Sequence, residues 1–537
     1  MANNTDAATM NLSQKEFHIA PMIDVSTVEF RYFIRLLTKR AVIWNQMVVA
    51  DTLVHRSRIH KTNKGNASYD LTSSGGREDA DCDDVELTQD LKKHCGWYDG
   101  CIDDDVCPNP TICQIGSNNP AEAAFATRIA QKCGYDSIDL NCGCPSDKVT
   151  GRCFGAALMK DQDTAVEVVS SMVHEAQSFA SHLPVSVKTR IGVDDDDSFD
   201  FIASFIQRLV DAGCRHFFMH ARKLFSEGLS PAQNRTIPPL DYPCVYRLVE
   251  CFPQCSFVVN GGLMSLEHAR KVAFGSTVQF DESGNGMNDS STSYCLVTDH
   301  AVPCRICNLP HGSCLGPPHI SPANLRGVMV GRLARDRPAD LADVDRYFYG
   351  EPSNPCYNRR ELLDRYISFL ERAYPRRCCD DDETITLGMV KDMHRTIVTE
   401  RHFCSVCQEF RGRNGEACNV TPTGNAVENH PPEASNDFNP QQRQSNRRTK
   451  RHAKCKGAKI VTRIMDRALQ PTWGILSGEA GKSAFRNVSH ELSRDNKVRN
   501  CGPGYILWKA MQSAPDDVWD KPFELSGGKK ISYYPTK

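Results

Sequence analysis

The sequence predicts a (β/α)8 barrel (a TIM barrel) followed by a smaller all-helical C-terminal domain. Short apolar runs rich in Val, Ile and Phe recur eight times, with helical patterns between them. The runs are nearly continuous rather than alternating, as in strands that are buried on both faces of a parallel sheet. Polar residues or glycine follow the runs, and barrels carry their chemistry at those strand ends. Spacing alone leaves a doubly wound open sheet as the alternative.

The predicted strands recur along the chain, with two long gaps after the second and the seventh. They occupy residues 17–22, 41–48, 110–116, 137–143, 185–192, 216–222, 256–262 and 327–332. Helical patterns lie at 120–134, 163–180 and 199–213, with weaker ones at 241–252 and 265–274. The pattern at 120–134 begins with Pro120 and ends on Gly134, which are typical first and last residues of a helix.

Two polar stretches interrupt the barrel, and the pattern changes after it. We expect a tail at 1–16, then a barrel at 17–345 with surface insertions at 57–108 and 276–323, both rich in Ser, Asn, Gly and Asp. Helical patterns at 359–374, 384–403, 459–470 and 482–494 predict a second domain at 346–520, with a polar insertion at 404–458. Residues 521–537 form a second tail.

Composition excludes some classes of protein. The net charge is −2, so a nucleic-acid partner needs a local basic signal, and residues 447–459 carry seven Lys or Arg and no acid. A solvated insert or a nuclear-import-like patch explains this run about as well as RNA contact does. The start has no basic and apolar leader, and no apolar run approaches the roughly 20 residues that span a bilayer. We expect a cytoplasmic monomer without a membrane anchor, and an organellar form with a different start stays open.

The 25 cysteines are expected to be reduced, because no secretory leader precedes them. Cys304, Cys307, His311 and Cys314 form a compressed cluster that zinc ligation would also explain. No second CxxC pair follows the cluster. We therefore predict no metal site.

The ends of the predicted strands carry residues suited to a phosphorylated ligand. Gly261, Gly262 and Gly331 follow the last two strands, where backbone N–H groups can reach phosphate oxygens, and Arg332 adds a positive charge. Lys188, Gln114 and His220 lie at three other ends. Together they suit flavin mononucleotide (FMN), because the amide pairs with a pyrimidine edge and the lysine stabilises negative charge on the reduced ring. The alternative is that Lys188 and His220 are satisfied polar groups of the core.

The motifs in these segments resemble those of the tRNA-dihydrouridine synthases, and most closely the bacterial A-type branch. They are IAPMIDVSTVEFRYFIRLL, LNCGCPSDKVTGRCFGAALM, VKTRIGVDDDDSFDF, HARKLFSEGLSPAQNRTIPPLDYP, VNGGLMSLEHA and GVMVGR, in chain order. The resemblance covers the barrel segments outside the insertions. VTRIMDRALQ and GKSAFRNVSHELS are similar to that branch's C-terminal helical domain.

The resemblance implies a cofactor, a reaction and a set of residues. FMN would be bound through Pro21, Met22, Gln114, Lys188, His220, Asn260, Gly261, Gly262, Gly331 and Arg332. NAD(P)H would reduce the flavin, with NADPH as the expected reductant. Hydride would pass from flavin N5 to C6 of a uracil ring, and Cys144 would give a proton to C5. The A-type branch points to U20 and U20a of the tRNA D-loop.

The same resemblance implies where the substrate tRNA binds. Asn141 would lie against a base turned out of the RNA stack. Further contacts would come from Arg190, Arg222, Asn234, Arg235, Lys482 and Arg486. Two rivals remain: a flavin barrel acting on a small pyrimidine, like the dihydroorotate dehydrogenases, and a catalytically inactive RNA-binding barrel.

Overall fold

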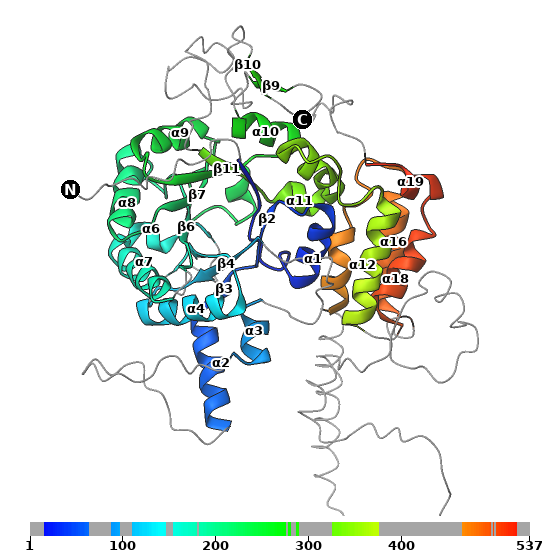
Figure 1. The fold of residues 1–537 in the computed structure, drawn as a ribbon, viewed down its shortest axis with the longest axis horizontal. Coiled ribbons are helices and arrows are strands. Elements are labelled where there is room, and N and C mark those ends of the chain that lie inside the picture. Colours follow the sequence, from blue (N-terminus) through cyan, green and yellow to red (C-terminus); the bar gives the residue numbers. More distant parts are fainter. Residues whose placement is uncertain are drawn as a thin grey trace, which may run out of the picture. The chain divides into compact units, whose positions relative to one another are not determined.

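The computed structural model describes most of the predicted barrel and part of the helical region. The described residues are 15–63, 87–96, 110–145, 154–179, 182–274, 278–280, 286–288, 325–374, 464–495, 498 and 501–523. They divide into two compact units (Figure 1). The first comprises the described residues within 1–363, 470–482 and 516–537, and the second comprises those within 364–469 and 483–515. Each unit is described by itself.

The first unit contains a closed parallel barrel (Figure 1). The sheet order is β2-β1-β11-β8-β7-β6-β5-β4-β3, and pairing of β2 with β4 closes it. The strands are β1 (Glu16–Ile19), β2 (Val42–Trp44), β3 (Val48–Val49), β4 (Thr111–Gly116), β5 (Ser137–Asn141), β6 (Val185–Arg190), β7 (His216–His220), β8 (Ser256–Asn260) and β11 (Leu325–Val330). The predicted barrel is therefore confirmed, and the open sheet is wrong.

One predicted strand is split in two. Residues 41–48 form β2 and the start of β3, with a break at Asn45, Gln46 and Met47. The buried side chain of Asn45 explains the break, because its Oδ1 accepts a 2.7 Å hydrogen bond from the Gln114 backbone N–H of β4. A side chain thus replaces a bond of the strand ladder at this point. β2 and β3 both pair with β4 and together take the place of one strand of the barrel.

The barrel interior is filled by large apolar side chains. The cluster comprises Ala20, Val42, Trp44, Ile112, Phe218, Val258 and Met329. Trp44 and Phe218 meet edge to face with ring centroids 4.6 Å apart, a favoured geometry for aromatic pairs. Because the interior is packed, a ligand has to bind at one end of the barrel rather than pass through it.

Helices surround the strands (Figure 1). Those that the sequence predicted are α4 (Pro120–Cys133), α7 (Gln162–Gln177), α8 (Phe199–Asp211), α9 (Tyr242–Cys251) and α10 (Leu266–Phe274). α4 shows why the prediction worked. Asn119 Oδ1 accepts hydrogen bonds from two backbone N–H groups of its first turn, and Gly134 ends it at φ 88°.

Other helices were not predicted. They are α1 (Val28–Leu37), α2 (Ala50–Asn63), α3 (Gln89–His94), α6 (Ala157–Lys160) and α11 (Arg332–Asp336). α2 and α3 extend into the range 57–108, where the sequence predicts a polar surface insertion. α3 buries only Leu91, so its sequence carries no apolar stripe, and its start is marked instead by the capping side chain of Thr88. In the range 276–323, the described residues form the antiparallel pair β9 (Val278–Phe280) and β10 (Gly286–Asn288).

The described part of the chain after the barrel is helical, as predicted. It contains the short turns η4 (Pro338–Asp343), η5 (Val344–Phe348) and η6 (Gln470–Thr472), and the helices α12 (Arg359–Ala373), α16 (Lys482–Arg494), α18 (Gly502–Met511) and α19 (Asp516–Asp520). In the second unit, the Tyr366 hydroxyl donates a 2.8 Å hydrogen bond to the Ala468 carbonyl. The predicted helix at 384–403 and the polar insertion at 404–458 lie outside the described residues.

Candidate active site

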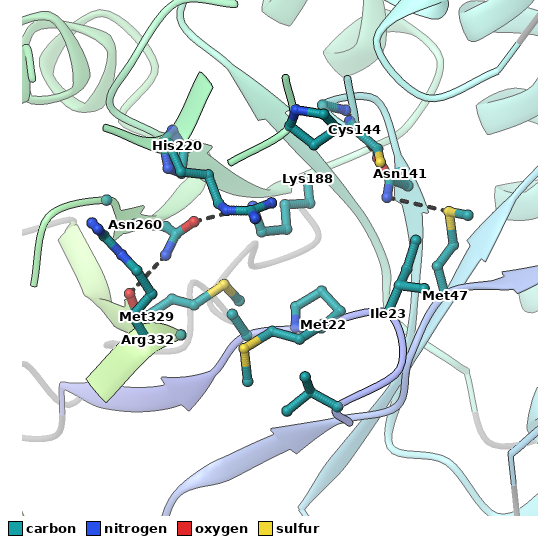
Figure 2. Close-up of a pocket in the computed structure, with 18 of the residues that line it drawn as sticks. Met22, Ile23, Met47, Asn141, Cys144, Lys188, His220, Asn260, Met329 and Arg332 are labelled. Carbon is teal, nitrogen blue, oxygen red and sulfur yellow. Dashed lines mark hydrogen bonds between the residues drawn. The ribbon is translucent and has the colours of Figure 1, made fainter. Parts of the chain in front are cut away.

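A cavity of about 450 Å³ opens at the carboxyl ends of the barrel strands (Figure 2). Most of the predicted site residues line it: Pro21, Met22, Gln114, Asn141, Cys144, Lys188, Arg190, His220, Arg235, Asn260, Gly261, Gly262, Gly331 and Arg332. They come from seven strands of the barrel or from the loops that follow them. In a closed parallel barrel all of these ends meet on one side, so residues far apart in sequence share the cavity.

The cavity has a positive lining. Lys188, Arg190, Arg235, Arg332 and Arg335 contribute cationic side chains, and Asp24 is the single carboxylate among the described residues that line it. Cations facing a concave, partly dehydrated space favour an anionic ligand.

Lys188 lies on β6 near the centre of the close-up (Figure 2). Its ammonium donates a 3.2 Å hydrogen bond to Asn260 Oδ1, and Asn260 Nδ2 in turn donates to the Met329 carbonyl at 2.8 Å. Burial, together with the neighbouring charge of Arg190, lowers the pKa of Lys188 to about 8, while Asp139 opposes the change. A negative charge placed beside this lysine would offset the cost of its burial.

His220 ends β7 and its ring is buried. Burial, followed by the charges of Arg190 and Lys188, holds the pKa of His220 well below its usual value, so the ring is neutral. Its Nδ1 has no hydrogen-bond partner within the described part of the chain. A buried polar atom of this kind normally has a hydrogen-bond partner. A ligand in the cavity could supply that partner to His220.

Three glycines form one end of the cavity. Gly261 and Gly262 have φ of 120° and 69°, a backbone conformation that favours glycine, and Gly331 precedes α11. The Tyr242 hydroxyl donates to the Gly261 carbonyl at 2.5 Å and fixes the turn. A Cβ added at Gly262 would collide with the Leu240 side chain. With Arg332 beside them, these turns fit a phosphate group.

Cys144 lies in a short loop after β5 that is braced from two sides. The Asn141 Oδ1 accepts hydrogen bonds from the backbone N–H groups of Gly143 at 3.0 Å and Cys144 at 3.1 Å. Arg190 Nε donates to the Gly143 carbonyl at 3.1 Å. The thiol of Cys144 is partly exposed to the cavity, whereas Cys142 is fully buried and its pKa is raised by burial. Of these two thiols, Cys144 is the one that a ligand can reach.

The residues present fit a ligand with a phosphate at one end and a hydrogen-bonding ring at the other. The glycine turns supply the phosphate cradle. The unpartnered His220 Nδ1 and the buried Lys188 supply polar groups for the ring and its chain. Flavin mononucleotide has this combination of groups.

Four predicted residues, Arg222, Asn234, Lys482 and Arg486, do not line the cavity. Arg222 is buried, and its guanidinium donates to the Pro238 carbonyl. Asn234 is also buried, and its side chain bonds to the backbone of Phe225 and Leu229. Both side chains therefore hold the loop after β7 in shape. Lys482 and Arg486 occupy exposed positions of α16.

Two further predictions cannot be placed. Cys304, Cys307, His311 and Cys314 lie outside the described residues, as does the basic run at 447–459. Among the residues that the structure does describe, no group of three or more Cys, His, Asp or Glu side chains has a metal-binding arrangement. In the same residues, no helix is both long and apolar enough to cross a bilayer.

Sequence reasoning missed several lining residues. Met47 lies in the break between β2 and β3, and its Sδ lies 3.3 Å from Asn141 Nδ2. Arg335 follows Arg332 by three residues, so helical spacing was a signal for both sharing one face. Ile23 has 49% of its surface exposed at the rim of the cavity, which only the structure reveals.

Comparison with known proteins points to one family. A family model described as dihydrouridine synthase (Dus) matches residues 96–279. A tRNA-dihydrouridine(20/20a) synthase of Shewanella oneidensis is 36% identical over 371 residues, covering 69% of this chain and 82% of that protein. A protein of the same name from Pasteurella multocida is 31% identical over 356 residues, covering 66% of this chain and 80% of its own length.

Solved structures give a weaker likeness. The structure of a 2,3-dimethylmalate lyase, a PEP mutase/isocitrate lyase superfamily member, has a TM-score of 0.26 and 15% sequence identity, covering 46% of this chain and 67% of that chain. No functional argument rests on it.

Proposed function

Because the chain belongs to the dihydrouridine synthase family and is a tRNA-dihydrouridine synthase, an oxidoreductase, we propose that it reduces U20 and U20a of the tRNA D-loop. The names of its relatives specify these two positions. The observation that carries the proposal is the meeting of an accessible thiol, a buried lysine and a phosphate cradle in one cavity. The residues 346–520 are proposed to form the RNA-binding domain.

The residues at the barrel mouth suit FMN, which the family uses. FMN, when bound and reduced by NADPH, would supply the hydride for C6 of the uracil ring. Gly261, Gly262, Gly331 and Arg332 would hold its phosphate. Pro21, Met22, Gln114, Lys188, His220 and Asn260 would surround the rest of it.

Cys144 would supply the proton for C5 of the uracil ring. Reduction of the 5,6 double bond requires a proton as well as a hydride, and a positioned side chain is the usual proton donor. The loop is held by Asn141 and Arg190, so the thiol keeps its place at the cavity. The contacts of Asn141 run to this loop and to Gln114, and a contact between Asn141 and the base remains part of the proposal.

The substrate base must leave its stack to reach this cavity. Arg235 lines the cavity and would meet phosphates of the RNA backbone. Arg335 also lines the cavity, but its guanidinium is paired with the carboxylate of Asp336 at 2.7 and 2.9 Å. The exposed side chain of Ile23 offers an apolar surface at the same rim. Arg222 and Asn234 would contribute indirectly, by shaping the loop that carries Arg235.

The test is a reconstituted reaction. Purified full-length protein, FMN and NADPH are incubated with a modification-free tRNA transcript, and dihydrouridine is mapped by mass spectrometry. We expect dihydrouridine at positions 20 and 20a. Equal reduction of free pyrimidines would favour the dihydroorotate-type rival, and a protein that binds tRNA but neither flavin nor NADPH would favour the inactive barrel.

A further inference from the structure

A chain of side-chain hydrogen bonds runs beneath the cavity from β6 to the Cys144 loop. Ser186 Oγ lies 3.0 Å from Asp139 Oδ1, and Gln114 Nε2 donates to Asp139 Oδ2 at 2.8 Å. Asn141 Nδ2 then donates to Gln114 Oε1 at 3.2 Å. At the far end, Asn141 Oδ1 accepts from the backbone of Gly143 and Cys144. The chain therefore links a buried acid to the backbone of the reactive cysteine.

From this chain we propose that Asp139 is a positioning residue, whose buried oxygen fixes the orientation of the Gln114 and Asn141 amides and so holds the Cys144 loop. The inference rests on the proposed function, because it assigns a purpose to the position of the Cys144 thiol. Asp139 itself does not line the cavity.

The direction of the chain is fixed at its Cys144 end and matched by an acceptor at its Asp139 end. Backbone N–H groups only donate, so Asn141 must turn its oxygen toward Cys144 and its nitrogen toward Gln114. Gln114 then presents its nitrogen to residue 139, where an acceptor is required. Asp139 Oδ2 provides that acceptor whether the acid is ionised or carries its proton on the oxygen that faces Ser186.

The burial of a carboxyl group at position 139 costs free energy. It lies on β5 with no exposed surface, between the apolar residues Ile138 and Leu140. Burial raises the pKa of Asp139 to about 8, although Gln114, Ser186 and Lys188 counteract the change. An apolar side chain here would avoid this desolvation but would leave Gln114 Nε2 without an acceptor.

The test compares three variants of the full-length flavoprotein. Asp139→Ala removes the acceptor, and Asp139→Asn keeps one through its side-chain oxygen. Asp343→Ala is the matched control, because Asp343 is also a buried acid that accepts a 2.7 Å bond from an amide, that of Asn354, and it does not line the cavity. All three substitutions should lower the melting temperature or leave it unchanged.

Two measurements separate positioning from a general loss of stability. The first is the rate of Cys144 alkylation by iodoacetamide, followed by mass spectrometry with buried Cys142 as the internal reference. The second is dihydrouridine formation per bound flavin. Asp139→Ala should raise the alkylation rate severalfold and lower kcat by on the order of 100-fold, with KM for tRNA nearly unchanged. Asp139→Asn and Asp343→Ala should match the wild type in both.

Three results would overturn the proposal. The first is an Asp139→Ala variant with the alkylation rate and kcat of the wild type, and the second is an Asp139→Asn variant that is as impaired as Asp139→Ala. The third is an Asp343→Ala variant with a raised Cys144 alkylation rate and a lowered kcat. If Asp139→Ala does not fold, Gln114→Met breaks the chain at its middle, and an unchanged Cys144 alkylation rate in that variant also overturns it. Alkylation does not depend on the reaction. A wild-type protein that makes no dihydrouridine would contradict the proposed function, but the alkylation measurement would still test the role of Asp139.

Discussion

Charged side chains have different surroundings at the two ends of the barrel. At the start of the strands, Glu16 of β1 lies 3.1 Å from His18 Nε2 and 2.6 Å from Arg326 Nη2 of β11. His216 Nδ1 and Ser256 Oγ, at the starts of β7 and β8, lie 2.7 Å apart. These groups satisfy one another within the protein. Their arrangement contributes to stability and requires no ligand.

At the other end of the strands, positive groups face a cavity. Burial and the neighbouring charge of Arg190 lower the pKa of both Lys188 and His220, and Nδ1 of His220 has no partner in the described residues. Charge at the start of the strands is paired for stability, whereas charge at their ends is arranged for an anion that must come from outside. Substitutions at the two ends should therefore have different consequences.

The largest effect is expected at the thiol. Cys144→Ala should retain its flavin and its reduction by NADPH, but should form dihydrouridine at least about 100-fold more slowly, because a positioned general acid is lost. Cys142→Ala is the control, since that thiol is buried two residues away. Single-turnover assays on a tRNA transcript measure both variants. Product at the wild-type rate in Cys144→Ala would remove Cys144 from the mechanism.

Lys188→Met should weaken flavin binding by about tenfold or more, because it removes a buried positive charge that lines the cavity. Fluorescence titration of FMN into the apoprotein measures this. An unchanged dissociation constant would exclude Lys188 from the flavin site.

The same substitution, Lys188→Met, should not lower the stability of the apoprotein, although it weakens flavin binding. The pKa of Lys188 in the folded protein, about 8, lies below its ordinary value of 10.5. The charged lysine therefore lowers stability at neutral pH, and this penalty fades as the pH rises from about 8 to 10.5. We expect Lys188→Met apoprotein to be at least as stable as the wild type at pH 7, with a smaller difference at pH 10. Denaturant unfolding at both pH values checks the sign.

Glu16→Gln should affect stability alone. Burial would raise the pKa of Glu16, but the hydrogen bonds and charges of His18 and Arg326 bring it to about 2, below its ordinary 4.5. Its contribution, about 2–3 kcal/mol, is present above pH 4.5 and is lost as the pH falls toward 2. Unfolding measured at pH 7 and pH 3 should show the variant destabilised mainly at pH 7. A fall in turnover per bound flavin would contradict the division between the two ends.

The smallest effect is expected at the rim. Arg235→Ala should weaken tRNA binding a few-fold and reduce the slope of log affinity against log salt by about one, as for the loss of one phosphate contact. Arg247→Ala is the control, because Arg247 lies on α9 with its guanidinium 3.7 Å above the Phe199 ring. Binding titrations at several salt concentrations compare the two. Equal slopes would place Arg235 outside the RNA path.

Much of the fold and the site follows from local sequence. The eight apolar runs predict the strands of the barrel, because a parallel barrel buries both faces of each strand. Their polar ends place Gln114, Lys188 and His220 in one cavity without any knowledge of the loops.

The remainder depends on partners that are distant in sequence. The break at Asn45 arises because its side chain bonds to β4, and Arg222 turns inward to the Pro238 carbonyl because of the path of its loop. Asp139 lies in an apolar run, and its partner Gln114 precedes it by 25 residues. No local pattern reveals such contacts.

A crystal structure of the full-length protein with FMN tests the central claim most directly. We predict the phosphate at the turns of Gly261, Gly262 and Gly331 beside Arg332, the ring against Lys188 and Gln114, and the Cys144 sulfur facing that ring across an open space. A flavin bound elsewhere, or a sulfur turned away from the barrel mouth, would contradict the account.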